Sequence, residues 1–257
     1  VSGLAELATI LPAQAIDPEV HRLIEGGPQE RRRFLDWGVF HVEPNFVEHW
    51  RRYQRALRQR NAALKAGAVP ALVRAWDPEL LEAGELVAAS RARYLQALAP
   101  HVAATAERLL GHPLDITLLQ GWAVERTLQE SIEASWARDR ERAVTHAGPH
   151  RADIAVRFEG APARDRISRG QQKLAAAALL LGQLRCDAEL GSSVAALLVD
   201  DPAAELDAGN LERLLREVVS LPAQLFVTAL DPQNPALANL PEGHRFHVEH
   251  GSVTRLI

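Results

Sequence analysis

A wholly apolar strand that ends in two aspartates is the feature that most constrains the fold of this chain. Residues 195–199 read AALLV and are followed directly by Asp200 and Asp201. A strand without polar residues on either face is typical of the centre of a parallel sheet that helices cover on both sides. Open sheets of this kind bind ligands at the carboxyl ends of their strands. The run therefore predicts an α/β fold, with both acids at the edge where a site would lie.

Two interpretations of the acid pair are open at this point. Adjacent carboxylates at a strand end are costly unless they bind a cation, polarise water or accept backbone N–H groups. Alternation along a strand sends successive side chains to different sides, so Asp200 could reach a Mg²⁺ shell while Asp201 orients water. The alternative is a plain turn in which Asp201 caps a helix that begins at Pro202.

The segment SRGQQKLAAAALLLGQL begins polar and then becomes apolar. Ser168 followed three residues later by Gln171 fits a capping box, which predicts a helix over residues 169–184. A helix N-terminus carries unpaired N–H groups and a partial positive charge, and both suit phosphate. Gly170 lets another molecule approach the backbone, and Lys173 adds a cation one turn in. The alternative is an ordinary capped core helix.

Strands alternate with helices through the second half of the chain, which predicts an α/β domain with a largely parallel sheet. A second capping box, Thr127 with Glu130, marks the start of one of these helices. Residues 4–16 predict a short helix and then a strand that enters a turn. Further strands are expected at 114–122, 152–160, 195–199, 224–230, 245–250 and 252–257, and helices at 127–143 and 210–219.

Two long helices are expected in the first half. Apolar residues at helical spacing predict one helix over residues 46–65, and a second opens at Asp77 and closes at Gly111 as its C-cap. We expect Pro100 to kink or split the second helix. Because a short Gly/Pro linker joins the two, they suggest an antiparallel hairpin, and we assign residues 28–111 to a helical arm.

This arm carries a local excess of positive charge. Residues 28–65 hold nine Lys and Arg against four acids, although the whole chain has a net charge of −4. Such a patch suits phosphate contact and would make binding strongly salt-dependent. The alternative is a solvated helix face, and the arginines at 31–33 can instead pair with acids inside the head. The candidate DNA contacts are Arg51, Arg52, Arg55 and Arg58.

The cysteine and histidine content of the chain indicates its cellular compartment and bears on whether it binds zinc. The single cysteine, Cys186, allows no internal disulfide and is typical of a reducing compartment. The ten histidines show no metal-ligand spacing with it, so no zinc site is expected. No apolar run is long enough to cross a membrane. We expect a soluble, cytoplasmic protein with no membrane contact.

Three motifs in order carry a family resemblance. SRGQQ, LLVDD and AELD, at this spacing, resemble the ATPase heads of the ABC/SMC superfamily. The segments PEVHRLIEGGPQERRRFLDW, QRNAALK and HAGPHRADI resemble more specifically the RecF family of bacterial replication and repair proteins. The similarity runs from about residue 4 to the C-terminus. Another SMC-like head is the alternative, but the arm is short and its heptads are not sustained, which argues against a long coiled coil.

The resemblance implies a role for each matching residue. Asp200 would be the Walker B acid that holds Mg²⁺ through its shell, and Asp201 would be the catalytic carboxylate that activates water. The signature motif, which would cap the γ-phosphate of ATP held by the opposite subunit, consists of Ser168, Arg169, Gly170 and Gln171. The D-loop, which would line the subunit interface, consists of Ala204, Glu205, Leu206 and Asp207.

Three further positions are informative within the resemblance. Thr228 and Ala229 fall where many ABC ATPases have a switch histidine. Ala229 cannot supply an imidazole, so hydrolysis is expected to be slow or to use another group. Gln14 is the candidate Q-loop residue.

No segment of the chain matches the phosphate-cradling P-loop, and the first residue is Val1 rather than Met. The resemblance places the P-loop upstream, so we expect residues 1–257 alone to bind ATP poorly. It also implies that residues 1–27 end an N-terminal ATPase lobe and that residues 112–257 form a C-terminal lobe with the signature, Walker B and D-loop motifs.

The function that the resemblance implies is ATP-dependent DNA binding in recombinational repair and replication-fork maintenance. The full protein would be a weak DNA-dependent ATPase that forms an ATP-dependent homodimer at gaps and single-strand/double-strand junctions. It would help to load recombinase with a RecR-type recombination mediator. The alternative is a non-catalytic module that binds DNA or a partner through the arm.

Overall fold

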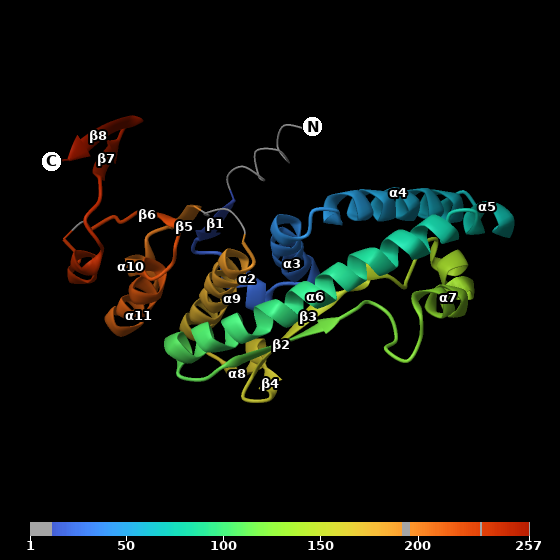
Figure 1. Cartoon of the computed structure of the whole chain (residues 1–257), viewed down its shortest axis with the longest axis horizontal. Coiled ribbons are helices and arrows are strands. Elements are labelled where there is room, and N and C mark those ends of the chain that lie inside the picture. Colours follow the sequence, from blue (N-terminus) through green and yellow to red (C-terminus); the bar gives the residue numbers. More distant parts are fainter. Residues whose placement is uncertain (1–11, 192–195, 232, 257) are drawn as a thin grey trace.

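The computed structural model describes residues 12–191, 196–231 and 233–256 (Figure 1). Three strands form a parallel sheet in the order β1-β5-β6: Ala13–Ile16, Ala196–Val199 and Gln224–Val227. Because β5 pairs with both neighbours, the prediction of a central parallel strand that ends at Asp200 is confirmed. The helix expected before β1 lies outside the described residues.

Within the described part of the chain, one face of this sheet is buried and the other is partly exposed. Leu197 and Val199 are buried in the main core together with residues of α9 and α11. The register places Ala15, Leu198 and Phe226 side by side on the other face, where Leu198 and Phe226 are 43% and 50% exposed. The expectation that β5 is covered along both faces is therefore wrong at Leu198, which stays exposed among the described residues, although Ala196 on the same face is buried.

Two long helices cross at the centre of the molecule. Helix α9 (Arg169–Glu189) begins at the predicted capping box and continues five residues past the predicted end. Helix α6 (Asp77–Leu110) passes through Pro100 as one helix, so of the expected kink or split the split is wrong. A Cβ added to Gly182 of α9 would lie 2.9 Å from backbone atoms of Val102 on α6, so this glycine allows the two helices to approach closely.

The arm is a helical hairpin, as predicted. Helix α4 (Phe46–Lys65) has the predicted bounds and packs along the first half of α6, and the short helix α5 (Pro70–Arg74) joins them at the far end (Figure 1). Helix α7 (Leu128–Arg142), which begins at the predicted capping box of Thr127, lies at the same end. Since α6 also packs on α9, one helix belongs to both the arm and the head, and the division of the chain into lobes stays a prediction.

A second sheet, which the sequence did not predict, lies against α6. Strands β2 (Leu114–Leu119), β3 (Asp153–Phe158) and β4 (Ala161–Pro162) pair antiparallel in chain order. The strands at 114 and 153 were expected, but not their separation from the parallel sheet. The 3₁₀ turn Pro149–Arg151 leads into β3, and the short helix α8 (Ala163–Arg166) leads toward α9.

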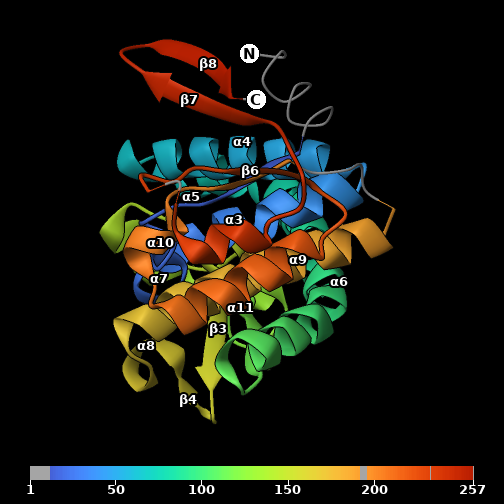
Figure 2. The ribbon, with the colours of Figure 1, turned by 90° about the vertical axis from the view of Figure 1, so that its left-hand side faces the viewer.

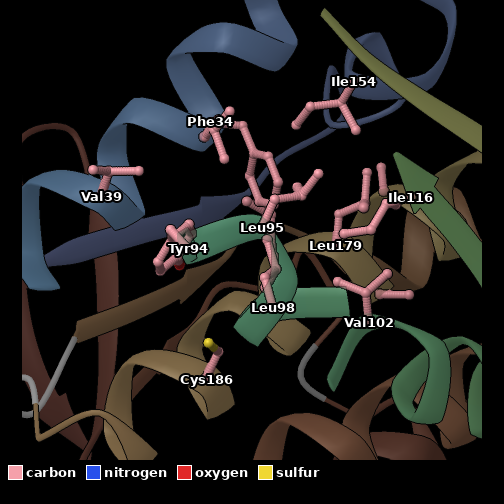
Figure 3. Close-up of a cluster of buried hydrophobic side chains, with 14 of the residues drawn as sticks. Phe34, Val39, Tyr94, Leu95, Leu98, Val102, Ile116, Ile154, Leu179 and Cys186 are labelled. Carbon is pink, nitrogen blue, oxygen red and sulfur yellow. The ribbon is translucent and has the colours of Figure 1, made fainter. Parts of the chain in front are cut away.

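The core gathers at the junction of arm and head. Helix α3 (Pro28–Val42), which follows the short helix α2 (Arg22–Glu25), was not predicted and buries Phe34 and Val39 there. Figure 3 shows side chains of α3, α6, α9, β2 and β3 converging around Tyr94 and Leu95.

The C-terminal part adds β6 to the parallel sheet and then forms a separate pair of strands. Helices α10 (Pro202–Glu205) and α11 (Ala208–Val219) follow β5, and the 3₁₀ helix Pro235–Asn239 follows β6. The last two expected strands are β7 (Arg245–Glu249) and β8 (Ser252–Leu256), which pair antiparallel and stand apart from the other elements in Figures 1 and 2. Among the described helices, none combines the length and the apolar character needed to cross a membrane.

Candidate nucleotide site

The two acids lie at the carboxyl end of β5, as predicted, but the strand alternation does not extend to both of them. The Asp200 amide donates to the carbonyl of Ile16 at 2.9 Å, which continues the β1–β5 ladder by one residue. Asp201 leaves the extended conformation, with φ 37° and ψ 58°. The expectation that the pair points to opposite sides by alternation is therefore wrong, because alternation requires extended backbone at both residues.

The plain capping alternative is not what the structure shows. Asp201 occupies the N-cap position of α10, before Pro202, but its side chain makes no capping hydrogen bond. Asp200 is exposed, and of its two carboxylate oxygens only Oδ1 has a partner in the described structure. Exposed carboxylate oxygens are the donors that Mg²⁺ takes in proteins, usually beside water and phosphate, so the residues present fit this ion.

Thr228 joins the two acids. Its hydroxyl donates to Asp200 Oδ1 at 2.5 Å and accepts from the Asp201 amide, 2.9 Å from the hydroxyl oxygen. Its own amide donates to the carbonyl of Val199 at 3.0 Å. The sequence marked Thr228 and Ala229 only as the place where a switch histidine was missing, and nothing in the local pattern showed that the hydroxyl reaches both acids.

The signature segment is an exposed helix N-terminus. Ser168 accepts from the Gln171 amide, and the Gln171 side chain accepts from the Ser168 amide at 3.0 Å, which completes the capping box. Ser168, Arg169 and Gln171 are exposed, and a Cβ on Gly170 would meet nothing within 4 Å. The backbone at Gly170 is therefore open to another molecule, as the predicted role requires.

An ion pair joins this helix to the D-loop segment. Lys173, in the second turn of α9, contacts the carboxylate of Glu205 at the end of α10. Both side chains line a small cleft with Asp17 and Asp200. The remaining D-loop residues differ in setting, because Ala204 is exposed and Leu206 packs against the core.

Asp207 ends the D-loop by capping the next helix. Its side chain accepts from the amide of Asn210 at 2.9 Å and from the Asn210 side chain. These hydrogen bonds to the charged form, the backbone bond first, lower the pKa of Asp207. The sequence did not predict this capping role.

Gln14 does not stand at the end of its strand. It lies within β1, and its side chain donates to Gln183 of α9 at 2.7 Å, while Gln183 donates to the carbonyl of Phe34. This hydrogen-bond chain connects the sheet to α9 and α3. The described contact of the Q-loop candidate Gln14 is therefore a structural hydrogen bond and does not involve the two acids.

The four candidate DNA contacts on α4 divide into two groups. Arg51, Arg55 and Arg58 are exposed and make no hydrogen bond or ion pair in the described structure, and we call them the arm stripe. They lie on one face of α4 over about 10 Å. Arg52 differs because it pairs with Glu79 and Glu82 of α6, and the hydrogen bonds to these carboxylates raise its pKa.

Other arginines of the basic segment are structural. Arg60 is fully buried and pairs with Asp77 and Asp139, so counting it with an exposed basic patch was wrong. Arg31 pairs with Asp153 at 2.7 Å, and Arg32 donates to the carbonyl of Ala152, so these two hold α3 to β3. Within the described ranges, no three His, Cys, Asp or Glu side chains gather as a metal site; the absence of zinc stays a prediction.

Comparisons with known proteins agree with the fold and give a family. No protein-family model matches the chain. It is 43% identical, over 260 aligned positions, to the DNA replication and repair protein RecF of Xanthomonas euvesicatoria, and covers 70% of that protein. It is 44% identical over 262 positions to RecF of Pseudomonas aeruginosa and covers 69% of it. Each alignment includes at least 98% of the chain.

A solved structure of the recombination mediator protein RecF-ATPrS in the RecFOR pathway superposes with a TM-score of 0.84 at 24% identity. The match covers 98% of this chain and 70% of that one. The structure of RecF with ATP gives the same TM-score at 23% identity. The chain thus has the fold of these solved RecF structures. By its identity to the relatives above, it belongs to the RecF family of DNA replication and repair proteins.

Proposed function

We propose that this chain supplies two complementary parts of an ATP site, each used in a different copy of the protein. The observation that carries the proposal is that the acids at the end of β5 and the open N-terminus of α9 lie on separate elements of one head. The acids would serve the nucleotide of their own subunit. The Ser168 cap and Gly170 would serve the nucleotide of a second copy, so that ATP holds two copies together.

The roles of the residues follow from their chemistry. Asp200 would hold Mg²⁺ through the ion's water shell with its free oxygen, and Asp201 would accept a proton from the attacking water. When bound, ATP would supply the phosphoryl group, and Mg²⁺ would neutralise part of the negative charge on it. The backbone N–H groups at the start of α9 would face the γ-phosphate. Since Ala229 offers no imidazole, turnover would be slow, which suits ATP as a switch for dimerisation.

The dimer can be tested at Gly170. Replacing Gly170 with Glu puts a carboxylate where the partner's phosphate would lie, yet an acid in the first turn of a helix is well tolerated. We expect this variant to fold normally and to lose dimerisation with a non-hydrolysable ATP analogue, measured by sedimentation velocity. Gly27→Glu, at the equally open start of α3, is the matched control. Normal dimerisation of Gly170→Glu would refute the role of this cap.

The DNA surface that we propose is the arm stripe. Three exposed arginines that make no hydrogen bond or ion pair in the described structure can contact successive phosphates, whereas Arg52 and Arg60 already pair with carboxylates. Following the family, the DNA would be gapped or carry a single-strand/double-strand junction. The protein would act there in the cytoplasm with a RecR-type mediator to help load recombinase. Each phosphate contact adds about 0.7–0.9 to the slope of log affinity against log salt.

The stripe is tested by changing Arg51, Arg55 and Arg58 to Gln together. We expect weaker binding to gapped DNA and a salt slope that is shallower by about 2 to 3, measured by fluorescence anisotropy. The control makes the same change of charge on α8 and α11, in arginines that already have local partners: Arg164, Arg213 and Arg216. An equal effect of both triple variants would place the DNA elsewhere. DNA binding that ATP does not change would favour the non-catalytic alternative.

A further inference from the structure

We infer that Thr228 is the positioning residue of the acid pair: its hydroxyl orients Asp200 for the metal and holds Asp201 in its turn. The inference rests on the proposed ATP site and adds a residue to it. It is carried by two hydrogen bonds of one hydroxyl, which donates to the Asp200 carboxylate and accepts from the Asp201 amide, together with the unusual backbone of Asp201.

The hydrogen bonds fix the direction of the hydroxyl proton. Because an amide can only donate, the bond from the Asp201 amide uses a lone pair of the Thr228 oxygen. The single proton is then directed at Asp200 Oδ1. This leaves Asp200 Oδ2 without a partner in the described structure. Thr228 therefore holds one carboxylate oxygen and leaves the other available to a Mg²⁺ shell, as a partner of a metal-binding side chain does.

The second bond stabilises a costly backbone. Asp201 has φ 37°, in the left-handed region that residues other than glycine seldom adopt. Such conformations persist where surrounding contacts determine them, and they cluster at functional sites. Here the amide of Asp201 is held by the side chain of Thr228, which directly follows the neighbouring strand β6. Without that bond the turn that places the second carboxylate would lose its anchor.

The position of Thr228 is itself set by the sheet. Its amide continues the β5–β6 ladder to the carbonyl of Val199, one residue past the end of β6. The backbone thus brings the side chain to the acids without help from the hydroxyl. Thr228 is exposed, and a hydrogen bond at the surface adds little to stability. Losing the hydroxyl should therefore change the site much more than the fold.

The test compares Thr228→Val, which keeps the shape of the side chain, with Thr228→Ser, which keeps the hydroxyl. Thr117→Val, on an exposed strand position of β2 that makes no side-chain hydrogen bond in the described structure, is the matched control. The protein is purified as encoded, with any sequence that precedes Val1. Mn²⁺ affinity is measured by electron paramagnetic resonance with a non-hydrolysable ATP analogue, beside kcat, KM and thermal unfolding.

We expect Thr228→Val to lose about 10- to 100-fold in Mn²⁺ affinity or kcat, the usual cost of removing a partner of a metal-binding residue. KM for ATP and the unfolding temperature should stay near those of the unchanged protein. Thr228→Ser should recover most of the loss, and Thr117→Val should lose nothing. Unchanged Mn²⁺ affinity and kcat in Thr228→Val, or equal losses in the Val and Ser variants, would overturn the inference.

Asp200→Asn separates this inference from the proposed site. If Asp200→Asn weakens Mn²⁺ binding and Thr228→Val does not, the ATP site stands and the role of Thr228 fails. If Asp200→Asn also leaves Mn²⁺ binding unchanged, the proposed site itself fails, and the positioning role fails with it.

Discussion

Replacing Arg60 with Met should destabilise the protein far more than the same change at Arg58, two residues away. The Arg60 side chain is fully buried between α4, α6 and α7. Its Nε lies 2.8 Å from Asp77, and its Nη1 lies 2.8 Å from both Asp139 and Thr145. Methionine fills much of the same space but cannot compensate either carboxylate.

The expected magnitude follows from the exposure of the two acids. Asp77 is 20% exposed and can take up water, whereas Asp139 is 0% exposed. Asp139 would keep only the donors of His146. Removing one partner of a buried ion pair costs about 3–5 kcal/mol because the other charge stays buried. In a protein of this size that corresponds to a fall in Tm of about 6–20 °C. Arg58→Met, on the exposed face, should stay within about 0.5 kcal/mol.

Urea unfolding followed by circular dichroism measures these free energies. Arg60→Met combined with Asp139→Asn should be less destabilised than Arg60→Met alone, because the uncompensated charge is gone. The effects on DNA binding should be reversed. Arg58→Met should make the dependence of log affinity on log salt shallower, and folded Arg60→Met should leave it unchanged. A loss below about 1 kcal/mol in Arg60→Met, or equal losses at both positions, would refute the reasoning.

Three further outcomes are expected. Gly182→Ala should cost about 1–3 kcal/mol in urea unfolding, because its Cβ would press on the Val102 backbone, whereas Gly209→Ala, with room around it, should be neutral or slightly stabilising. Burial raises the pKa of Asp187 to about 7, so folding takes up a proton, and the free energy of unfolding should fall as pH rises from about 4 to 7. Asp187→Asn should remove up to about 1.4 kcal/mol per pH unit from this pH dependence. An identical pH dependence in the variant and the unchanged protein would contradict the prediction. Asp201→Asn should keep nucleotide binding and lose ATP turnover by 10-fold or more, in a coupled assay of the protein as encoded; unchanged turnover would remove Asp201 from the reaction.

The parts of the site that sequence predicts are those that local pattern determines. The Ser168 capping box depends on residues three apart, and its hydrogen bonds form as expected. The apolar run before Asp200 predicts a central strand, and β5 does pair with a parallel neighbour on each side. The bounds of α4 follow in the same way from the spacing of its apolar residues. Their roles toward ATP are still predictions, which the experiments above address.

The parts that sequence does not predict depend on distant partners. Arg58 and Arg60 look alike in the sequence, and only contacts with Asp77 and Asp139 distinguish them. Thr228 meets Asp200 from 28 residues away, through strand pairing that brings β6 beside β5. The antiparallel pairing of β2 with β3 likewise joins segments on either side of α7, and alternation of strands and helices alone does not indicate it.

Because α6 is one continuous helix, it mechanically couples the arm to α9, the helix that begins at the signature segment. At 1.5 Å per residue, its 34 residues span about 51 Å. The contact of Val102 with Gly182 lies toward one end, about 37 Å from Asp77 at the other. A rotation of only 5° about that contact would displace the arm end by about 3 Å. Small rearrangements of α9 when a second copy binds would therefore be magnified at the arm stripe, and DNA held there would resist the same rotation.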